Sequence, residues 1–347
     1  MEFCTRNFQN EFHLIIMRKT LLITLLFIGY LSTSNAQQEA MFTKYMFNSL
    51  SYNPAYAGSH EFLSVRLLYR NQWVDFEGAP ESQTLTIHTP VNDRIGLGLS
   101  VFNDDIGVSG STGANLSYAY RFLVGPGKLS IGLQAGITNW RADFDELKFR
   151  DPQSSDAAFI GIDESQFLPN FGAGIFYYSK FWYAGFSSPR LIENNLRDRE
   201  STSVSESARL RRHYYFHAGA ALPLAGDDLI FKPSILIKNV GLFSSFSSNS
   251  QNIFEVGAPT EVDLDASVLF FDTFWVGLSF RTAIEAASDE SSVDSVDAWF
   301  SVQLANGIRV GAAYDQTLTK INAPSFELLL GYDFNYEVKR LNTPRYF

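Results

Sequence analysis

Strict alternation of large apolar residues with small or polar ones is the feature of this sequence that most restricts its fold. In "RIGLGLSVF" the odd positions from Ile95 to Val101 are large and apolar, whereas the even positions are Gly or Ser. "KLSIGLQAGIT" (residues 128–138) and "EVDLDASVLFF" (residues 261–271) follow the same pattern. A period of two places successive side chains on opposite faces of a β-strand. The chain is therefore predicted to be all-β.

About fourteen such segments are found, many of them close to the nine to eleven residues that a tilted membrane-spanning strand needs. The predicted strands are 62–73, 82–89, 94–103, 112–122, 128–139, 170–178, 181–187, 213–222, 228–238, 261–270, 273–284, 295–304, 307–316 and 325–336.

The connections between these strands alternate in length. The even-numbered ones are short: "TPVND", "LVGPG", "SK", "PLAGD", "FD" and "AN". The odd-numbered ones are mostly longer and polar, and the two longest run from Trp140 to Pro169 and from Ser188 to Arg212. Short turns at one end and long loops at the other are typical of an outer-membrane barrel with periplasmic turns and extracellular loops.

The number of strands indicates which face meets lipid. Eight strands already enclose an interior that side chains can just fill, and the diameter grows with strand number. About fourteen strands with their large apolar groups inside would leave a void, so those groups are expected to face hydrocarbon. The low charged content of 18% agrees, since soluble proteins average about 25%. The alternative is a soluble two-sheet protein that buries the same residues between its sheets.

The first 36 residues are predicted to be an upstream extension plus a signal peptide, with the start at Met17. "MRK" is followed by the short apolar run "TLLITLLFIGYL" and by small residues that end at Ala36. This is the layout of a Sec signal cleaved after Ala36, and cleavage would remove Cys4, the only cysteine. The predicted destination is the outer membrane, with residues 62–336 as the barrel and 337–347 as a C-terminal tail ending in Phe347.

Composition and motifs argue against several other classes. A net charge of −10 and the lack of a basic stripe exclude nucleic acid as a partner. The sequence has no H-E-x-x-H, G-x-S-x-G or Walker-type motif, so no catalytic residue and no cofactor are assigned. His213 and His217 would lie about 13 Å apart on a strand, which is too far for a shared metal, so no metal site is assigned.

Two charged segments can each be interpreted as a binding site or as a solvated loop. "RLRRH" (residues 209–213) either grips phosphates or an acidic partner, or is the solvated end of a loop. The acidic segment around Asp289 and Glu290 is most simply a hydrated loop, because sequence spacing alone does not show the converging oxygen ligands of a calcium site.

The segment 37–61 is unusual because it is aromatic, nearly uncharged and broken by proline. In "SLSYNPAYAG", Asn53-Pro54 favours a turn and Gly58 permits a positive φ. Its aromatic side chains need cover from water. The segment is therefore expected to lie on the periplasmic side or inside the lower lumen, where it packs against the barrel wall, plugs its mouth or contacts another protein.

With these motifs the chain resembles the PorP/SprF family, outer-membrane proteins that accompany the type IX secretion system of some Gram-negative bacteria. The motifs are dense over residues 41–140, and the family usually has a different residue pair at Thr43-Lys44 and a basic residue at Asp105. The signature residues, structural or partner-binding, are Asn53, Pro54, Gly58, Arg70, Gln72, Trp73, Gly78, Ala79 and Pro80.

This resemblance implies a fourteen-stranded barrel, in agreement with the strand pattern. It also implies a non-enzymatic role in the export or surface attachment of specific cargo proteins through their C-terminal domains, in some relatives linked to gliding motility. The partners would be the secretion machinery, these cargo domains and outer-membrane lipid. The alternatives are a general diffusion porin or solute channel, which needs an open polar lumen, and a barrel hydrolase, which needs a single reactive serine.

The signature around the end of the first strand also gives geometric expectations. Trp73 is expected in the outer, lipid-facing aromatic belt, and Gly78 and Pro80 in a stiff outer turn. Arg70 would then face the lumen and pair with carboxylates, with Asp263 and Asp265 as candidates.

Overall fold

The computed structural model describes residues 45–60, 62–143, 163–194, 210–226, 228–241, 258–284, 293–319 and 322–334. The predicted signal peptide, the acidic segment around Asp289 and the C-terminal tail lie outside these residues. Among the described residues, no helix is long and apolar enough to cross a membrane.

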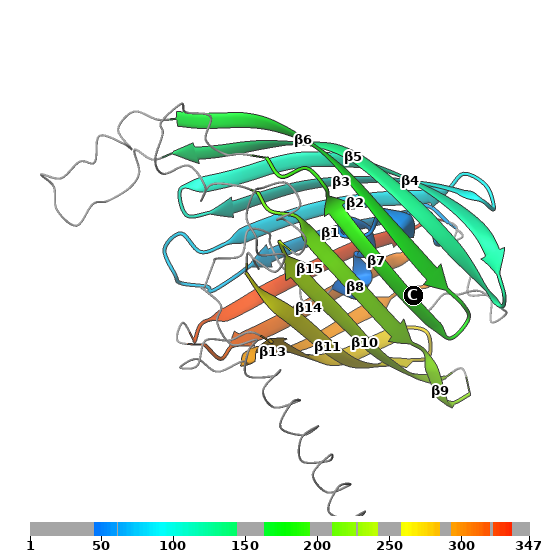
Figure 1. Cartoon of the computed structure of the whole chain (residues 1–347). Coiled ribbons are helices and arrows are strands. Elements are labelled where there is room, and N and C mark those ends of the chain that lie inside the picture. Colours follow the sequence, from blue (N-terminus) through cyan, green and yellow to red (C-terminus); the bar gives the residue numbers. More distant parts are fainter. Residues whose placement is uncertain are drawn as a thin grey trace, which may run out of the picture.

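Fifteen strands and three one-turn 3₁₀ helices make up the described structure (Figure 1). The helices are η1 (Tyr45–Phe47), η2 (Ser49–Ser51) and η3 (Pro54–Tyr56). The strands are β1 (Ser64–Asn71), β2 (Glu81–Pro90), β3 (Ile95–Ile106), β4 (Ser109–Val124), β5 (Gly127–Asp143), β6 (Asp163–Tyr178), β7 (Trp182–Arg190), β8 (His213–Ala220), β9 (Leu222–Ala225), β10 (Leu229–Val240), β11 (Ala258–Phe270), β12 (Phe274–Ala283), β13 (Val293–Gln303), β14 (Ile308–Thr317) and β15 (Pro324–Asp333).

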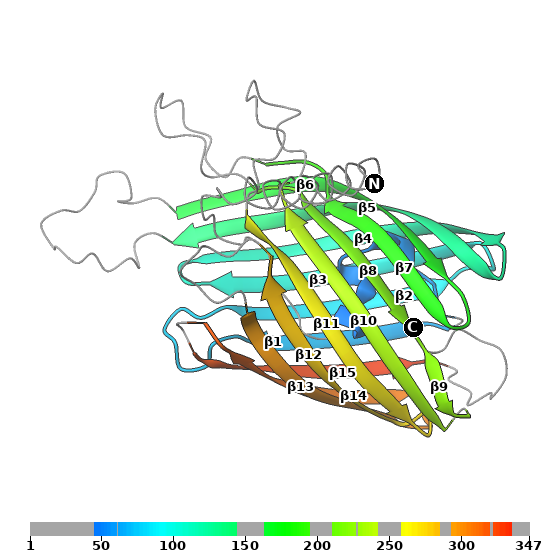
Figure 2. The same cartoon turned by 60° about the horizontal axis from the view of Figure 1, so that its bottom comes forward.

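The strands form one closed antiparallel barrel (Figures 1 and 2). Sequential strands pair around the ring, β1 pairs with β15, and β10 pairs with β11. Both β8 and β9 pair with β10, so together they occupy one of fourteen positions. Closure gives each of the fourteen positions a paired neighbour on both sides, which is what hydrocarbon requires of a spanning sheet. The predicted fourteen-stranded barrel is confirmed.

The connections distinguish the two ends of the barrel. The six connections predicted to be short, at 91–94, 125–126, 179–181, 226–228, 271–273 and 304–307, all lie at the end where β1 begins and β15 ends. We call this the short-turn end and the opposite one the long-loop end. The predicted alternation of connection lengths therefore corresponds to real sidedness.

Neighbouring residues on one strand show the two faces of the wall. On β5, Leu133 is 60% exposed, whereas Gln134 is 6% exposed and Ser130 fully buried. Many of the large apolar residues that the alternation placed on one face are exposed on the outside of the barrel, as Leu97 and Ile131 are. The expectation that the bulky apolar groups point outward is confirmed.

Several strands are longer than predicted at the long-loop end. β3 and β4 meet in a two-residue turn at Gly107-Val108, where a polar loop was expected, and β5 and β6 shorten the expected loop 140–169 to 144–162. The reason is that outward residues there are polar and bond each other: Arg141 pairs with Asp105 at 2.6 Å. Polar composition was interpreted as loop, but it belongs to strands that continue beyond the apolar band.

Two further details differ from the sequence prediction. The strand expected over 213–222 is divided at Ala221 into β8 and β9, although the Ala221 backbone N–H still donates to Phe181 O in register with the β7–β8 ladder. Leu329, an exception to the alternation, is buried in the lumen beside Leu68, its cross-strand partner.

The outward direction of Leu133 predicts a depth-dependent response to charge. Leu133→Arg should lower the free energy of unfolding of the protein in lipid vesicles by about 2–4 kcal/mol, because it places a cation in mid-membrane. Phe122→Arg, at an outward position near the short-turn end of β4, should cost only about 0–1 kcal/mol. Urea titrations of vesicle-embedded protein measure both, and equal effects of the two substitutions would contradict the orientation.

Candidate functional site: the filled lumen

The three 3₁₀ helices lie inside the barrel, in the half nearer the short turns (Figures 1 and 2, blue). η3 contacts β4, β5 and β6, and η2 contacts β2 and β3. We call residues 45–59 the plug. Its side chains are mostly buried, including Tyr45, Tyr52 and Tyr56, so the aromatic surface that needed cover is covered by the barrel itself.

The sequence Asn53-Pro54-Ala55 builds the innermost turn of the plug. Asn53 caps η3, because its side-chain oxygen accepts from the backbone N–H of Ala55 at 3.0 Å, and Pro54 occupies the first helical position. The other end of the Asn53 amide donates to Ile175 O on β6 at 3.1 Å. One fully buried asparagine therefore shapes the turn and fastens it to the wall.

Glycines let the plug approach the wall closely. A β-carbon at Gly132 on β5 would overlap the backbone of Pro54 and Ala55, and one at Gly96 on β3 would overlap the backbone at Ala57 and Gly58. Gly58 itself has φ 65°, which favours glycine. The small residues on the inner face of the strands are therefore the surface that receives the plug.

Hydroxyl groups on the wall satisfy polar groups of the plug. Ser130 Oγ donates to Ala55 O at 2.6 Å and Ser187 Oγ donates to Tyr52 O at 2.7 Å. Thr86 Oγ1 donates to Asn48 Oδ1 at 2.7 Å. Arg121 donates to Gly58 O. Irregular backbone is tolerated at membrane depth when protein covers it in this way.

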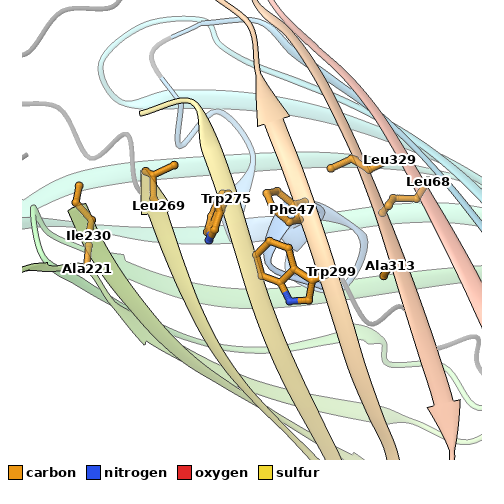
Figure 3. Close-up of a cluster of buried hydrophobic side chains, with 9 residues drawn as sticks. All are labelled: Phe47, Leu68, Ala221, Ile230, Leu269, Trp275, Trp299, Ala313 and Leu329. Carbon is orange, nitrogen blue, oxygen red and sulfur yellow. The ribbon is translucent and has the colours of Figure 1, made fainter. Parts of the chain in front are cut away.

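Phe47 anchors the opposite side of the plug in an apolar cluster with Leu68, Ala221, Ile230, Leu269, Trp275, Trp299, Ala313 and Leu329 (Figure 3). Its ring meets Trp275 edge-on at 4.6 Å and Trp299 at 5.3 Å between centroids. The Lys232 ammonium lies 3.4 Å from the centroid of the Trp275 ring. Aromatic contacts of this kind add to the free energy of simple burial.

The tyrosines of the plug remain neutral. Burial raises the pKa of Tyr56 to about 12 and raises that of Tyr52 well above its ordinary value. Both phenols therefore keep their protons at physiological pH. Tyr52 Oη donates to Ser49 Oγ at 2.8 Å, and Tyr56 Oη lies 3.0 Å from His60 Nε2.

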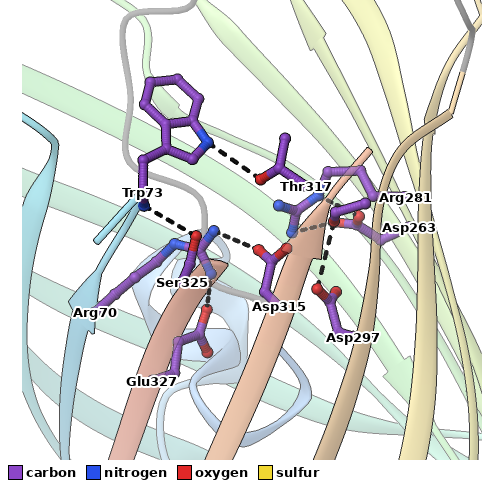
Figure 4. A network of polar contacts seen from close by, with 10 residues as sticks. Arg70, Trp73, Asp263, Arg281, Asp297, Asp315, Thr317, Ser325 and Glu327 are labelled. Carbon is purple, nitrogen blue, oxygen red and sulfur yellow. Dashed lines mark hydrogen bonds and ion pairs between the residues drawn. The ribbon is translucent and has the colours of Figure 1, made fainter. Parts of the chain in front are cut away.

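A row of charged side chains lines the other half of the lumen, toward the long-loop end, on β1 and β11–β15 (Figure 4). Arg70 donates to Glu327 at 2.5 Å and to Asp315 at 2.7 Å. Arg281 donates to Asp263 at 2.6 Å. Asp297 lies across from Asp315 and completes the row. At the short-turn end Arg66 forms a bidentate pair with Asp333, so β15 is tied to β1 at two heights.

Arg70 faces the lumen as expected, but the expected partners Asp263 and Asp265 were wrong. Its partners come from the adjacent strands β15 and β14, because Glu327 is directly across the β1–β15 ladder. Asp263 instead pairs with Arg281, its own cross-strand neighbour. Each inward arginine pairs with carboxylates on nearby strands, because an inward position on one strand lies directly beside an inward position on the next.

Trp73 also differs from expectation, since it is not in the lipid-facing belt. The strand ends at Asn71, and Trp73 has φ 51°, so the alternation of faces no longer applies there. Its indole N–H donates to Thr317 Oγ1 at 3.1 Å, and its backbone N–H donates to Ser325 Oγ, which places the ring over the edge of the charged row (Figure 4).

The remaining signature residues lie in the β1–β2 connection. The Gln72 backbone N–H donates to Pro80 O at 2.9 Å, and that of Ala79 donates to Phe76 O at 3.1 Å. Gly78 has φ 75°, and its carbonyl accepts from the N–H of Gly107 at 2.9 Å. These residues therefore shape a turn at the long-loop end. The plug residues of the signature are brought together in the lumen, but Gln72 and residues 78–80 are not brought to them.

The described residues of the histidine and arginine motifs contact neighbouring protein groups. His213 and His217 lie on β8, and His217 contacts the plug through Asn53 at 3.2 Å and Tyr52 Oη at 3.1 Å. Arg212 lies 3.7 Å from Glu193. Among the described residues no cluster of three or more His, Cys, Asp or Glu could hold a metal.

The wall residues that hold the plug, and the residues of the charged row other than Arg70 and Asp263, were not identified from the sequence. Ser130, Ser187, Gly132, Asp315 and Glu327 all occupy inward positions of the alternating pattern. That pattern was already visible, so inward charges and inward glycines were the signal that could have identified them.

Comparison with known protein families identifies the family of this barrel. The model of a family described as "Type IX secretion system membrane protein PorP/SprF" matches residues 34–332, which is most of the chain. The chain belongs to the PorP/SprF family. Family membership and the apolar outer band make it an outer-membrane barrel associated with type IX secretion.

Solved structures give more distant likenesses. The Acinetobacter baumannii outer membrane protein Omp33 is 9% identical with a TM-score of 0.42, covering 80% of this chain and 100% of that one. A KdgM porin is 9% identical with a TM-score of 0.36, over 78% and 99% of the two chains. A mutant of Rh. blastica porin is 10% identical with a TM-score of 0.35, over 79% and 99%. The search of curated proteins found no match.

The glycine contact predicts that the plug can be expelled by one side chain. Gly132→Leu should prevent the plug from seating, because the new side chain would occupy the space of Ala55, and the barrel should then conduct ions in planar bilayers. Wild type and Ala135→Leu, an outward change on the same strand, should stay closed. A silent Gly132→Leu barrel that is correctly folded would contradict the role of this contact.

The charged row predicts a large effect of Arg70. Arg70→Ala leaves Asp315 and Glu327 buried without their cation and should lower the free energy of unfolding by about 3–5 kcal/mol. Arg141→Ala breaks an exposed pair and should cost about 0–1 kcal/mol. Chemical denaturation in detergent measures both. Equal stability of the Arg70 variant and wild type would show that the row does not hold the barrel together.

Proposed function

We propose that this PorP/SprF protein is a non-enzymatic accessory of type IX secretion, needed for the export or surface attachment of specific cargo proteins through their C-terminal domains. The observation that supports this most directly is the plug. A barrel whose lumen is occupied by its own N-terminal segment is poorly suited to free diffusion of solutes. Its action would then come from its surfaces and loops, where a partner can dock.

The long-loop end is the side on which cargo would be held. Strands β3–β6 continue beyond the apolar band there and carry polar outward residues, including Asn139, Arg141 and Ser165. The described residues that flank 144–162 and 195–209 lie at the same end, and those two segments themselves fall outside the described residues. We propose that this end contacts the exported C-terminal domain.

Targeting completes the proposal. We propose that synthesis starts at Met17 and that Sec cleavage follows Ala36, so that the mature N-terminus begins a few residues before the plug. The proposed partners are the secretion machinery, cargo domains and outer-membrane lipid, with no nucleic acid and no cofactor. A contribution to gliding motility would follow where a cargo is a surface adhesin.

Deletion of the gene tests this function. One or a few cargo proteins should disappear from the cell surface while the others are still secreted, and the wild-type gene should restore them. Surface proteomics provides the measurement. Normal display of every cargo in the deletion strain would refute the proposal, and solute flux through the purified wild-type barrel would favour the porin alternative.

A further inference from the structure

A cavity of about 100 Å³ lies in the lumen above the plug. Its floor is formed by the plug, with Tyr45, Asn48 and Tyr52 among the contributing residues, and its walls come from β2–β5, β7, β8 and β10. It thus occupies the half of the lumen opposite the charged row. The volume would hold several water molecules, or a small ligand that replaced them.

Aromatic and neutral polar groups converge on this cavity. Phe102, Tyr215 and the two tyrosines of the floor supply ring surfaces. Uncharged hydrogen-bonding groups surround them, namely Ser51, Thr84, Ser100, Asn115 and Gln134. A few convergent polar groups among aromatic rings are the usual composition of a small-molecule site.

Asn48 offers a hydrogen-bond donor that the protein does not use. The residue is 3% exposed, and its Oδ1 accepts from Thr86 at 2.7 Å, which fixes the orientation of the amide. Its Nδ2 has no hydrogen-bond partner. A buried donor without a partner is costly, so the Asn48 amide would gain from an acceptor that reaches it from the cavity.

The charged residues of the cavity lie toward the long-loop end and largely balance. Asp104 and Arg190 are both near the outer ends of their strands, and Arg190 lies over the Phe102 ring at 5.8 Å. Lys238 is directly across the ladder from Glu261. The balance favours an uncharged ligand that enters from outside the cell.

We propose that this cavity binds a single neutral sugar ring, free or at the end of a glycan. Ring C–H faces would pack on Tyr52, Tyr215 and Phe102, and hydroxyl groups would bond the amides of Asn48, Asn115 and Gln134. A site that hydrogen-bonds hydroxyl groups discriminates strongly against ligands that lack them. This inference does not depend on the proposed function in secretion.

Saturation-transfer NMR on the purified, detergent-folded full chain tests the proposal. The probes are neutral methyl glycosides, a methyl uronate and a capped tripeptide, with affinity for a lone sugar expected at about the millimolar level. At least one neutral glycoside should give a saturable signal in the wild-type protein. Gln134→Leu should weaken it about ten-fold, because a buried amide partner is lost, and Ser100→Phe should abolish it by filling the cavity.

Gln303→Leu is the matched control, since Gln303 is a buried lumen residue outside the cavity, and it should bind like wild type. Heat-modified gel mobility verifies that each variant is folded. No saturable glycoside signal in folded wild type, an unchanged signal in Ser100→Phe, or preferential binding of the tripeptide or the uronate would each overturn the proposal. Cargo display in cells is measured separately, so either idea can fail alone.

Discussion

Hydrocarbon outside the barrel dictates what can exist inside it. Every strand alternates, so large apolar groups directed at lipid leave small and polar groups directed at the lumen. Fourteen strands enclose more space than such small side chains can fill. The chain fills part of that space with its own residues 45–59, which form three one-turn helices and no strand. The lipid-facing pattern and the plug are thus two consequences of one constraint.

Closure of the ring rests on contacts that the same alternation provides. Inward arginines on β1 meet inward carboxylates on β15, at Arg66 with Asp333 and at Arg70 with Glu327. These pairs join the first and last strands, which are far apart in the sequence. Buried ion pairs contribute little net stability relative to apolar packing, but removing one partner is costly. We therefore interpret the row as specifying which strands meet and at which register.

Much of the fold could be predicted from the sequence, because burial of the strand faces has a simple period. The two faces of each strand and the sidedness of the turns followed from local pattern, and the outward direction of Leu97 or Ile131 followed from that pattern together with the number of strands. The failures occur where the period stops. Trp73 itself has a positive φ and lies beyond the end of β1, so its face could not be counted from Arg70. Strands β5 and β6 continue beyond the membrane, where outward residues become polar and resemble a loop. The partners of Arg70 depend on the register between β1 and β15, the pair of strands that closes the barrel. The position of the plug depends on the close fit of its backbone at Gly132. The local sequence pattern shows neither of these.

The direction of the side chains in the membrane is the claim on which the whole account depends. It can be measured with a bimane fluorophore attached at Leu133→Cys or at its neighbour Gln134→Cys, in the chain that begins after Ala36 and so has no other cysteine. In vesicles of acyl-chain-brominated lipid, the probe at 133 should be quenched strongly and the probe at 134 hardly at all. Equal quenching at both positions, or none at 133 in correctly inserted protein, would contradict the account.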